Sequence, residues 1–206
     1  MIAIIDYDAG NIKSVEKALL ALGEEVIVTS DARQILEADG VILPGVGAFG
    51  DAMKKLKDYG LVEVIHQVVE KKTPFLGICL GLQLLFESSE ESPGVKGLGI
   101  LEGQIVRIPD GEGIKVPHIG WNSLTYPNKG RLFEGIAENS YVYFVHSYYL
   151  RAKEDSIVTA ATEYGTYIHA SVEKDNVFAC QFHPEKSSDV GLTILKNFIQ
   201  ITKEGK

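Results

Sequence analysis

The side chain with the clearest chemical potential is the thiol of Cys79, which follows an apolar run and precedes a segment of helical pattern. Gly77 and Gly81 flank it, so the backbone can turn sharply there and a substrate carbonyl can approach the sulfur. At the start of a helix expected over Leu80–Glu87, the thiol meets unpaired N–H groups and the positive end of the helix dipole, which favour the thiolate. The amide of Leu80 can also donate to an oxyanion. This pattern predicts a nucleophilic cysteine, and a buried cysteine at a strand–helix junction is the alternative.

A nucleophilic thiol needs a base and a group that orients the base. His183 ends a strand-like run, and Pro184 stiffens the step to Glu185. Residues two apart on an extended chain share a face, so the carboxylate of Glu185 can hold one ring nitrogen of His183 while the other faces the thiol. The predicted catalytic residues are therefore Cys79, His183 and Glu185. Taken alone, the His-Pro-Glu run is more typical of a capped strand end.

The remaining histidines and the second cysteine lack comparable neighbours. We expect packing or partner contacts from the other histidines, which are His66, His118, His146 and His169. None of the histidines lies at metal-ligand spacing from the cysteines, so the sequence predicts no metal site. Cys180 lies between two phenylalanines on the strand face opposite His183, and we expect it to pack in the core.

A second glycine-rich turn, Pro44-Gly45-Val46-Gly47, follows a short apolar stretch. Its glycines let a peptide N–H approach a reacting oxygen, and they let that peptide rotate at low steric cost. The turn is predicted to complete the oxyanion hole together with Leu80, and a switchable hole follows from the rotation. An ordinary glycine turn and a phosphate cradle are the alternatives, although the turn lacks the lysine of phosphate-binding loops.

Composition limits the classes of function. The chain has 206 residues, of which 45% are hydrophobic, and it has no linker or low-complexity stretch, which predicts one domain over residues 1–206. A formal charge of −8 argues against nucleic acid and membranes as partners. No apolar run approaches the ~20 residues of a membrane span, and the N-terminus has no basic leader. With two cysteines, the composition predicts a cytoplasmic protein.

The first half of the chain alternates strand-like and helix-like segments, which predicts parallel strands. In order we expect strand Ile2–Ile5, helix Ile12–Leu22 capped by Asn11, strand Val26–Thr29, a short helix after Asp31, strand Val41–Leu43, helices Asp51–Tyr59 and Leu61–Lys71, and strand Phe75–Ile78. Strands dominate from 98 to 183, and a helix over Val190–Ile201 follows. The prediction is an α/β fold, a single-domain open mixed sheet flanked by helices, with antiparallel additions. The turn, the thiol and the base would then meet at the carboxyl edge of the sheet.

Several motifs resemble those of a known family. Those that resemble the class I (triad) glutamine amidotransferases are Pro44-Gly45-Val46-Gly47, Gly77-Ile78-Cys79-Leu80-Gly81-Leu82-Gln83 and His183-Pro184-Glu185. Four further motifs resemble those of one group within this family, the glutaminase subunits of imidazole glycerol phosphate synthases. These motifs are Ile5-Asp6-Tyr7-Asp8-Ala9-Gly10-Asn11, Pro117-His118-Ile119-Gly120-Trp121-Asn122, Tyr143-Phe144-Val145-His146-Ser147-Tyr148 and Phe182-His183-Pro184-Glu185-Lys186-Ser187. The resemblance covers essentially the whole chain. It implies the class I glutamine amidotransferase fold and hydrolysis of glutamine to glutamate and ammonia through a cysteinyl thioester.

The resemblance also implies roles for other residues. The implied glutamine-binding residues, each of which could equally make structural hydrogen bonds, are Gly47, Gln83, Glu91, Ser147 and Tyr148. The resemblance places four residues near a face that docks a partner: Asn11, Trp121, Tyr143 and Lys186. For the two aromatic residues among them, core packing is the alternative. The implied partner is a cyclase subunit, a (β/α)8 barrel bound as a heterodimer, which makes imidazole glycerol phosphate and an aminoimidazole carboxamide ribonucleotide in histidine biosynthesis. No metal or organic cofactor is implied.

Two other interpretations stay open at this point. A glutaminase subunit of another synthase, of the anthranilate or pyridoxal phosphate type, would keep the reactive thiol and change the partner. A non-catalytic interaction protein on the same fold would keep the scaffold and form no thioester at Cys79.

Overall fold

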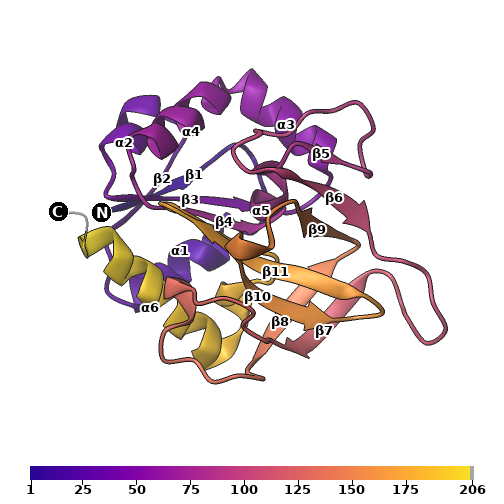
Figure 1. Cartoon of the computed structure of the whole chain (residues 1–206). Coiled ribbons are helices and arrows are strands. Elements are labelled where there is room, and N and C mark those ends of the chain that lie inside the picture. Colours follow the sequence, from indigo (N-terminus) through magenta and orange to yellow (C-terminus); the bar gives the residue numbers. More distant parts are fainter. Residues whose placement is uncertain (205–206) are drawn as a thin grey trace.

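The computed structural model of the protein describes residues 1–204, and its centre is a mixed β-sheet (Figure 1). The parallel half of the sheet has the order β2 (Val26–Thr29), β1 (Ile2–Ile5), β3 (Gly40–Gly45), β4 (Phe75–Cys79) and β12 (Val177–Cys180). Apart from the edge strand β2, these strands are apolar and buried along their whole length, as is typical of parallel strands covered on both faces. Their register pairs Gly45 with Cys79 and Ile78 with Cys180. The carboxyl ends of β3, β4 and β12 therefore lie side by side.

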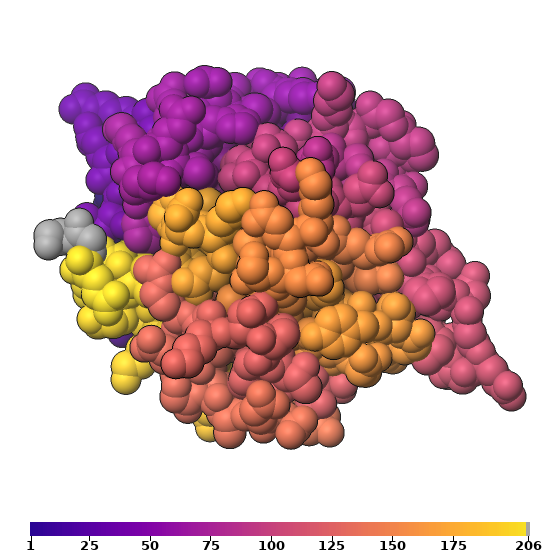
Figure 2. Space-filling model, viewed as in Figure 1, coloured from indigo at the N-terminus to yellow at the C-terminus, as the bar shows by residue number. Residues whose placement is uncertain are grey.

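The other half of the sheet is mainly antiparallel. It continues from β12 through β11 (Tyr167–Lys174), β9 (Tyr148–Ala152), β6 (Gly103–Arg107) and β5 (Ser88–Ser89), with β10 (Val158–Glu163) paired to β11 outside this path. A separate antiparallel pair is formed by β7 (His118–Ser123) and β8 (Tyr141–His146). The segment between β6 and β7 projects from the rounded body of the protein (Figure 2). The predicted open mixed sheet with antiparallel additions is confirmed.

Helices cover both faces of the parallel half (Figure 1). One face carries α2 (Ala32–Glu37), α3 (Phe49–Asp58) and α4 (Leu61–Glu70), and the opposite face carries α1 (Ile12–Ala21) and α6 (Ser188–Glu204). Shorter elements are α5 (Leu80–Leu84) and the 3-10 helices η1 (Arg131–Phe133), η2 (Asp155–Ile157) and η3 (Pro184–Lys186). Each long helix turns an apolar side to the sheet; in α4 the buried residues are Leu61, Val64, Ile65 and Val68, the spacing of one helix face. Within residues 1–204 no helix is long and apolar enough to cross a membrane.

The helix expected over Leu80–Glu87 is shorter than predicted and ends at Leu84. Its last carbonyls are taken by a returning segment of the chain, because the N–H of Leu98 donates to Leu84 and the N–H of Ile100 donates to Leu85. These hydrogen bonds replace the next helical turn. A sequence pattern cannot show that these N–H groups take the carbonyls a longer helix would use, since the donors come from more than ten residues further along the chain.

Two other expectations also change. The final helix, expected over Val190–Ile201, runs from Ser188 to Glu204, because Thr202 still packs against the backbone of Gly40 in the sheet. Asn11 stands at the N-terminus of α1 as expected, but its side chain makes no capping hydrogen bond. Its backbone is left-handed, with a φ of 74°, and its side chain reaches the segment after β12 instead.

Candidate active site

Cys79 ends β4 and immediately precedes α5, so its thiol stands at a sharp strand-to-helix turn. Its φ of 55° and ψ of −107° form a combination that few non-glycine residues adopt. The flanking glycines show how the turn is held. A Cβ on Gly81 would collide with the carbonyl oxygen of Leu43, and a Cβ on Gly77 would lie 2.7 Å from the carbonyl oxygen of Gly81. The backbone of α5 therefore packs directly on β3, which fixes the strained turn.

His183 follows β12, and η3 turns Glu185 back toward it. The Nδ1 atom of His183 lies 2.7 Å from Oε1 of Glu185, and both side chains are almost fully buried. An ionised carboxylate can only accept, so Nδ1 carries a proton and donates it. The other ring nitrogen, Nε2, makes no hydrogen bond of standard geometry within residues 1–204. It is therefore available to the thiol or to a substrate.

Opposing effects set the charge of His183. Burial lowers its pKa, but the sulfur of Cys79 in its ionised form and the carboxylate of Glu185 outweigh burial through hydrogen bonding and charge, and they raise the pKa of His183 to about 9. At neutral pH the ring is thus an imidazolium, which can protonate a leaving group.

Asn11 completes the group around His183. Its Nδ2 atom donates to Oε1 of Glu185 at 2.5 Å and lies 3.4 Å from Nδ1 of His183. Asn11 is the N-cap residue of α1, as the sequence predicted, but its side chain makes no capping hydrogen bond because the carboxylate of Glu185 uses its amide. Its predicted place near a docking face stays a prediction. Asparagine tolerates the left-handed backbone that directs it there.

A cavity of about 260 Å³ opens beside the thiol. Its lining consists of Val46, Gly47, Cys79, Leu80, Gln83, Glu91, Pro117, Val145, His146, Ser147 and Tyr148. Every residue that the resemblance implied for glutamine binding lies on this wall, and so do three of the four residues predicted for the oxyanion hole. Gly45 is the exception, because a Cβ there would point at the hydroxyl of Tyr7 and at Cβ of Leu80.

Two backbone segments reach the cavity near the thiol. Leu80 is the first residue of α5, so its N–H has no partner within the helix. Gly47 has a φ of 101°, in the region that favours glycine. The hydroxyl of Tyr7 donates to the carbonyl of Pro44 at 2.8 Å, which fixes the start of the turn. This hydrogen bond holds the carbonyl of Pro44, so the rotation predicted for the turn concerns only the residues after Pro44.

The polar residues of the wall are held by the protein itself. Oε2 of Glu91 accepts the N–H of Phe49 at 2.8 Å, at the start of α3. Nε2 of Gln83 donates to the carbonyl of Tyr148 at 3.1 Å and to Oε1 of Gln181 at 3.0 Å. These bonds orient the wall before any ligand enters, which reduces the entropy that binding must remove.

Gln181 is a residue of this site that the sequence did not single out. It is fully buried, and its Nε2 atom donates to Sγ of Cys79 at 3.7 Å. A signal existed, because Gln181 lies two residues before His183, and residues two apart on an extended chain point to the same side. An amide does no acid–base or nucleophilic chemistry, however, so its residue type does not attract attention.

The residues predicted near a docking face lie on adjoining elements. Trp121 of β7 is 51% exposed, and its ring meets that of the half-buried Tyr143 of β8 edge to face at a centroid distance of 6.1 Å. Core packing is therefore wrong for Trp121. The carbonyl of Tyr143 accepts the N–H of His183 at 2.9 Å, which places β8 against the segment that carries the exposed Lys186.

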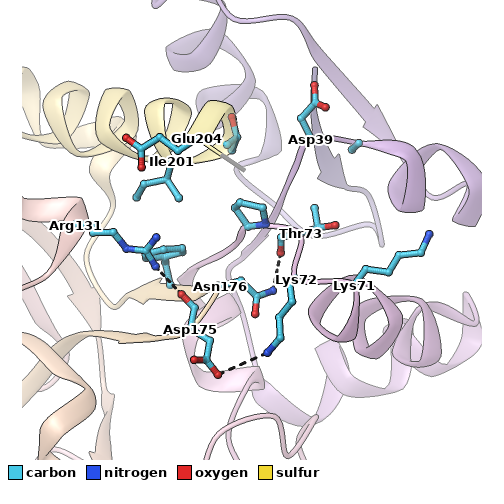
Figure 3. A pocket seen from close by; sticks show the side chains of 13 residues that line it. Asp39, Lys71, Lys72, Thr73, Arg131, Asp175, Asn176, Ile201 and Glu204 are labelled. Atoms are coloured by element: carbon cyan, nitrogen blue, oxygen red, sulfur yellow. Dashed lines mark hydrogen bonds and ion pairs between the residues drawn. The ribbon is translucent and has the colours of Figure 1, made fainter. Parts of the chain in front are cut away.

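A larger cavity, of about 520 Å³, lies at the opposite edge of the sheet, where β3, β4 and β12 begin (Figure 3). Its charged groups face one another: Lys72 lies 3.8 Å from Asp175, and Arg131 donates to the carbonyl of Asp175 while covering the ring of Phe178. Among its described lining residues there is no cysteine or histidine. We therefore assign the active site to the smaller cavity.

The fold and this site define a class I glutamine amidotransferase. Residues 3–201 match the family described as "Glutamine amidotransferase class-I". Solved structures show the same fold at low sequence identity. A glutamine amidotransferase is 20% identical with a TM-score of 0.77, covering 98% of this chain and 100% of that one. PurLQS from Thermotoga maritima is 20% identical with a TM-score of 0.72, covering 97% of each chain.

Relatives with higher sequence identity show which group of class I glutamine amidotransferases the chain belongs to. The imidazole glycerol phosphate synthase subunit HisH of Moorella thermoacetica is 54% identical over 98% of this chain and 95% of its own length. The HisH subunit of Aquifex aeolicus is 54% identical over 95% and 94%, and that of Methanocaldococcus jannaschii is 52% identical over 98% and 100%. The chain therefore belongs to the HisH family of glutamine amidotransferases, which confirms the family predicted from the motifs.

Proposed function

We propose that this protein hydrolyses the side-chain amide of glutamine to glutamate and ammonia through a thioester on Cys79. The observation that carries the proposal is the arrangement at the carboxyl edge of the sheet. Cys79 stands at a strained turn beside a cavity of about 260 Å³, with the buried pair of His183 and Glu185 next to it. A thiol beside an imidazolium supplies both a nucleophile and a proton donor.

The reaction begins when the thiolate of Cys79 attacks the amide carbon. The carbonyl oxygen becomes an oxyanion, which the N–H of Leu80 and a peptide N–H of the Gly45–Gly47 turn stabilise. His183 protonates the amide nitrogen from Nε2, and ammonia leaves. The neutral ring then takes a proton from the water that attacks the thioester, which releases glutamate and restores the thiolate. Glu185 holds the Nδ1–H throughout.

We assign glutamine binding to Gly47, Gln83, Glu91, Ser147 and Tyr148 because all of them line the cavity that holds the thiol. Among the described lining residues, Glu91 is the one carboxylate. It is therefore the natural partner for the α-ammonium group of the substrate, with Oε2 already held by the N–H of Phe49.

The ammonia needs a second protein that consumes it. We propose that this partner is the cyclase subunit of imidazole glycerol phosphate synthase, a (β/α)8 barrel bound as a heterodimer in the cytoplasm, which would serve histidine biosynthesis. The names of the relatives support this partner. So does the outer face of β7 and β8, where large exposed side chains gather beside η3: Ile119, Trp121 and Tyr141. Exposed aromatic residues of this kind are enriched at protein interfaces.

The experiment that tests the proposal replaces Cys79 with alanine and assays the complex with its cyclase. We expect glutamine-dependent synthesis to disappear, while synthesis from added ammonium salts continues, since the sulfur makes ammonia and the partner uses it. Cys180→Ala is the matched control, because that thiol is buried in the core and does not line the cavity. Glutamine-dependent turnover in the Cys79→Ala complex would show that Cys79 is not the nucleophile.

A further inference from the structure

Besides His183, whose charge acts on it, the sulfur of Cys79 has a polar neighbour on each of two other segments of the described chain, and the effects of these two neighbours oppose each other. It lies 4.0 Å from the carbonyl oxygen of Val145 and 3.7 Å from Nε2 of Gln181. A carbonyl can only accept, so Val145 favours the protonated thiol. An amide nitrogen can only donate, so Gln181 favours the thiolate. The nearer neighbour is the donor.

A glutamine amide could present either end to the sulfur, and only the nitrogen end supports the thiolate. The surrounding hydrogen bonds decide which end it is. The carbonyl of Tyr148 must accept, so the nitrogen of Gln83, at 3.1 Å, faces it. The second hydrogen of that nitrogen is directed at Gln181, at 3.0 Å, where it requires an oxygen. Gln181 therefore turns its oxygen to Gln83 and its nitrogen to Cys79.

The carbonyl of Tyr148 is also held from a second side. Nδ1 of His146 lies 2.8 Å from it and must donate, which leaves Nε2 of His146 to accept from Nδ1 of His118 at 3.0 Å. Nε2 of His118 is then the acceptor for the amide of Asn122 at 3.5 Å. Burial lowers the pKa of His118 to about 4 and that of His146 to about 3, so both rings stay neutral and keep this direction of donation.

We propose that Gln181 is a further catalytic residue, whose side-chain N–H donates to Sγ of Cys79 and stabilises the thiolate, with Gln83 and Tyr148 acting as positioning residues that fix its orientation. The role deepens the proposed function, since it rests on Cys79 as the nucleophile. Gln181 is fully buried, where an amide without a role would be an unnecessary cost. Both ends of its amide have a partner instead.

The test measures the rate at which iodoacetamide alkylates Cys79 as a function of pH, with the modified residue identified by mass spectrometry. Gln181→Met keeps the length of the side chain and removes the donor. A hydrogen bond to a charged group contributes enough that its loss should slow alkylation at neutral pH by about 10- to 100-fold and move the midpoint of the profile up by about one to two pH units. The kcat for glutamine should fall with it, while KM changes little.

Ser171→Ala is the matched control. Ser171 is also fully buried, lies on the neighbouring strand β11 and donates to the carbonyl of Ala179 at 2.7 Å, so its loss removes a buried hydrogen bond away from the thiol. Its alkylation profile should coincide with that of the wild type. A folded Gln181→Met protein whose profile also coincides with the wild type overturns the proposal.

If Gln181→Met does not fold, an NMR measurement on the wild-type protein tests whether the amide of Gln181 donates to Cys79. With 15N-labelled glutamine, the side-chain amide signal of Gln181 should shift with the midpoint of the alkylation profile, and it should stop responding in Cys79→Ala. A Gln181 signal that ignores the ionisation of Cys79 overturns the proposal. Alkylation needs no glutamine turnover, so this result is separate from the ammonia-rescue experiment that tests the proposed function.

Discussion

Asn11 and Glu185 are joined by a hydrogen bond of 2.5 Å although they lie 174 positions apart in the chain. The loop between β1 and α1 thereby reaches the carboxylate that holds His183. The same loop reaches the oxyanion turn, because Tyr7 donates to the carbonyl of Pro44. One short segment thus contacts both the base and the turn that is proposed to stabilise the oxyanion.

The first prediction concerns this contact. Asn11→Gly removes the amide but accepts the left-handed backbone, so the loop should keep its shape. Losing a donor to a charged carboxylate should lower the kcat for glutamine by about 10-fold, because Glu185 holds the imidazolium less firmly. Asn197→Ala is the control, since the amide of Asn197 donates to two carbonyls near η1, away from the candidate active site. Equal kcat values for both variants would mean that Asn11 does not support the base.

Glu185→Gln tests the orienting carboxylate itself. The variant keeps the shape of the side chain and removes the negative charge that helps to raise the pKa of His183 to about 9. The pKa of His183 should therefore fall, because burial then meets less opposition. An NMR titration of His183 measures the fall, and kinetics should show a larger loss in kcat than rise in KM. Unchanged turnover would leave Glu185 with a structural role.

Those residues of the site that carry reactive groups were predictable from the sequence. Cys79, His183 and Glu185 each have a side chain that can do chemistry, and each lies at or shortly after the end of a strand whose apolar run is readable. Parallel register then brings the strand ends together without further information. The lining of the cavity by Gln83 and Tyr148 was implied by the family motifs rather than by periodicity.

The contacts of Gln181, Asn11 and Tyr7 were not predictable in the same way. Their side chains are ordinary hydrogen-bonding groups, and their meaning depends on which atom lies opposite in three dimensions. The early end of α5 has a similar cause, since the donors that replace its next turn come from a distant segment. Local patterns report strands and helix faces, whereas such contacts depend on the packing of the whole chain.

The stacked histidine His118 should make stability depend on pH. It lies between Phe144 and Tyr164, with ring centroids at 4.8 and 3.9 Å, and burial lowers its pKa to about 4 from an ordinary 6.5. Above pH 6.5 His118 is neutral in both the folded and the unfolded chain, so its full contribution to the free energy of unfolding is present. Below that value the unfolded chain binds a proton that the folded chain refuses, so the free energy of unfolding should fall as the pH falls toward about 4.

His118→Phe checks this dependence, because phenylalanine can stack but cannot titrate. Urea unfolding measured at several pH values between 7 and 4 should show a shallower loss of the free energy of unfolding in the variant than in the wild type. The variant should also be less stable at pH 7, since Nε2 of His146 loses its donor. A pH slope equal to that of the wild type would contradict the assigned role of His118.

The last prediction concerns the hypothesis that the oxyanion hole is switched on by the partner. Rotation of the peptide between Val46 and Gly47 changes φ of Gly47, which rests at 101°. A Cβ on Gly47 would meet nothing within 4 Å, so Gly47→Ala affects the backbone alone, whereas a Cβ on Gly45 would lie 2.5 Å from the hydroxyl of Tyr7 and disturb packing. Gly47→Ala is therefore the cleaner variant.

An alanine at position 47 is strained at the positive φ of the resting conformation, and this strain should lower the population of that conformation by roughly tenfold. If rotation supplies the missing donor, basal glutamine turnover in Gly47→Ala should rise and the ratio of stimulated to basal turnover should fall by a similar factor. The ratio is measured with and without the cyclase and its ribonucleotide. Gly23→Ala is the control, because Gly23 also has a positive φ, 79°, with nothing within 4 Å, and it does not line the cavity. Equal ratios in wild type, Gly47→Ala and Gly23→Ala would rule out the switch and leave Cys79, His183 and Glu185 unaffected.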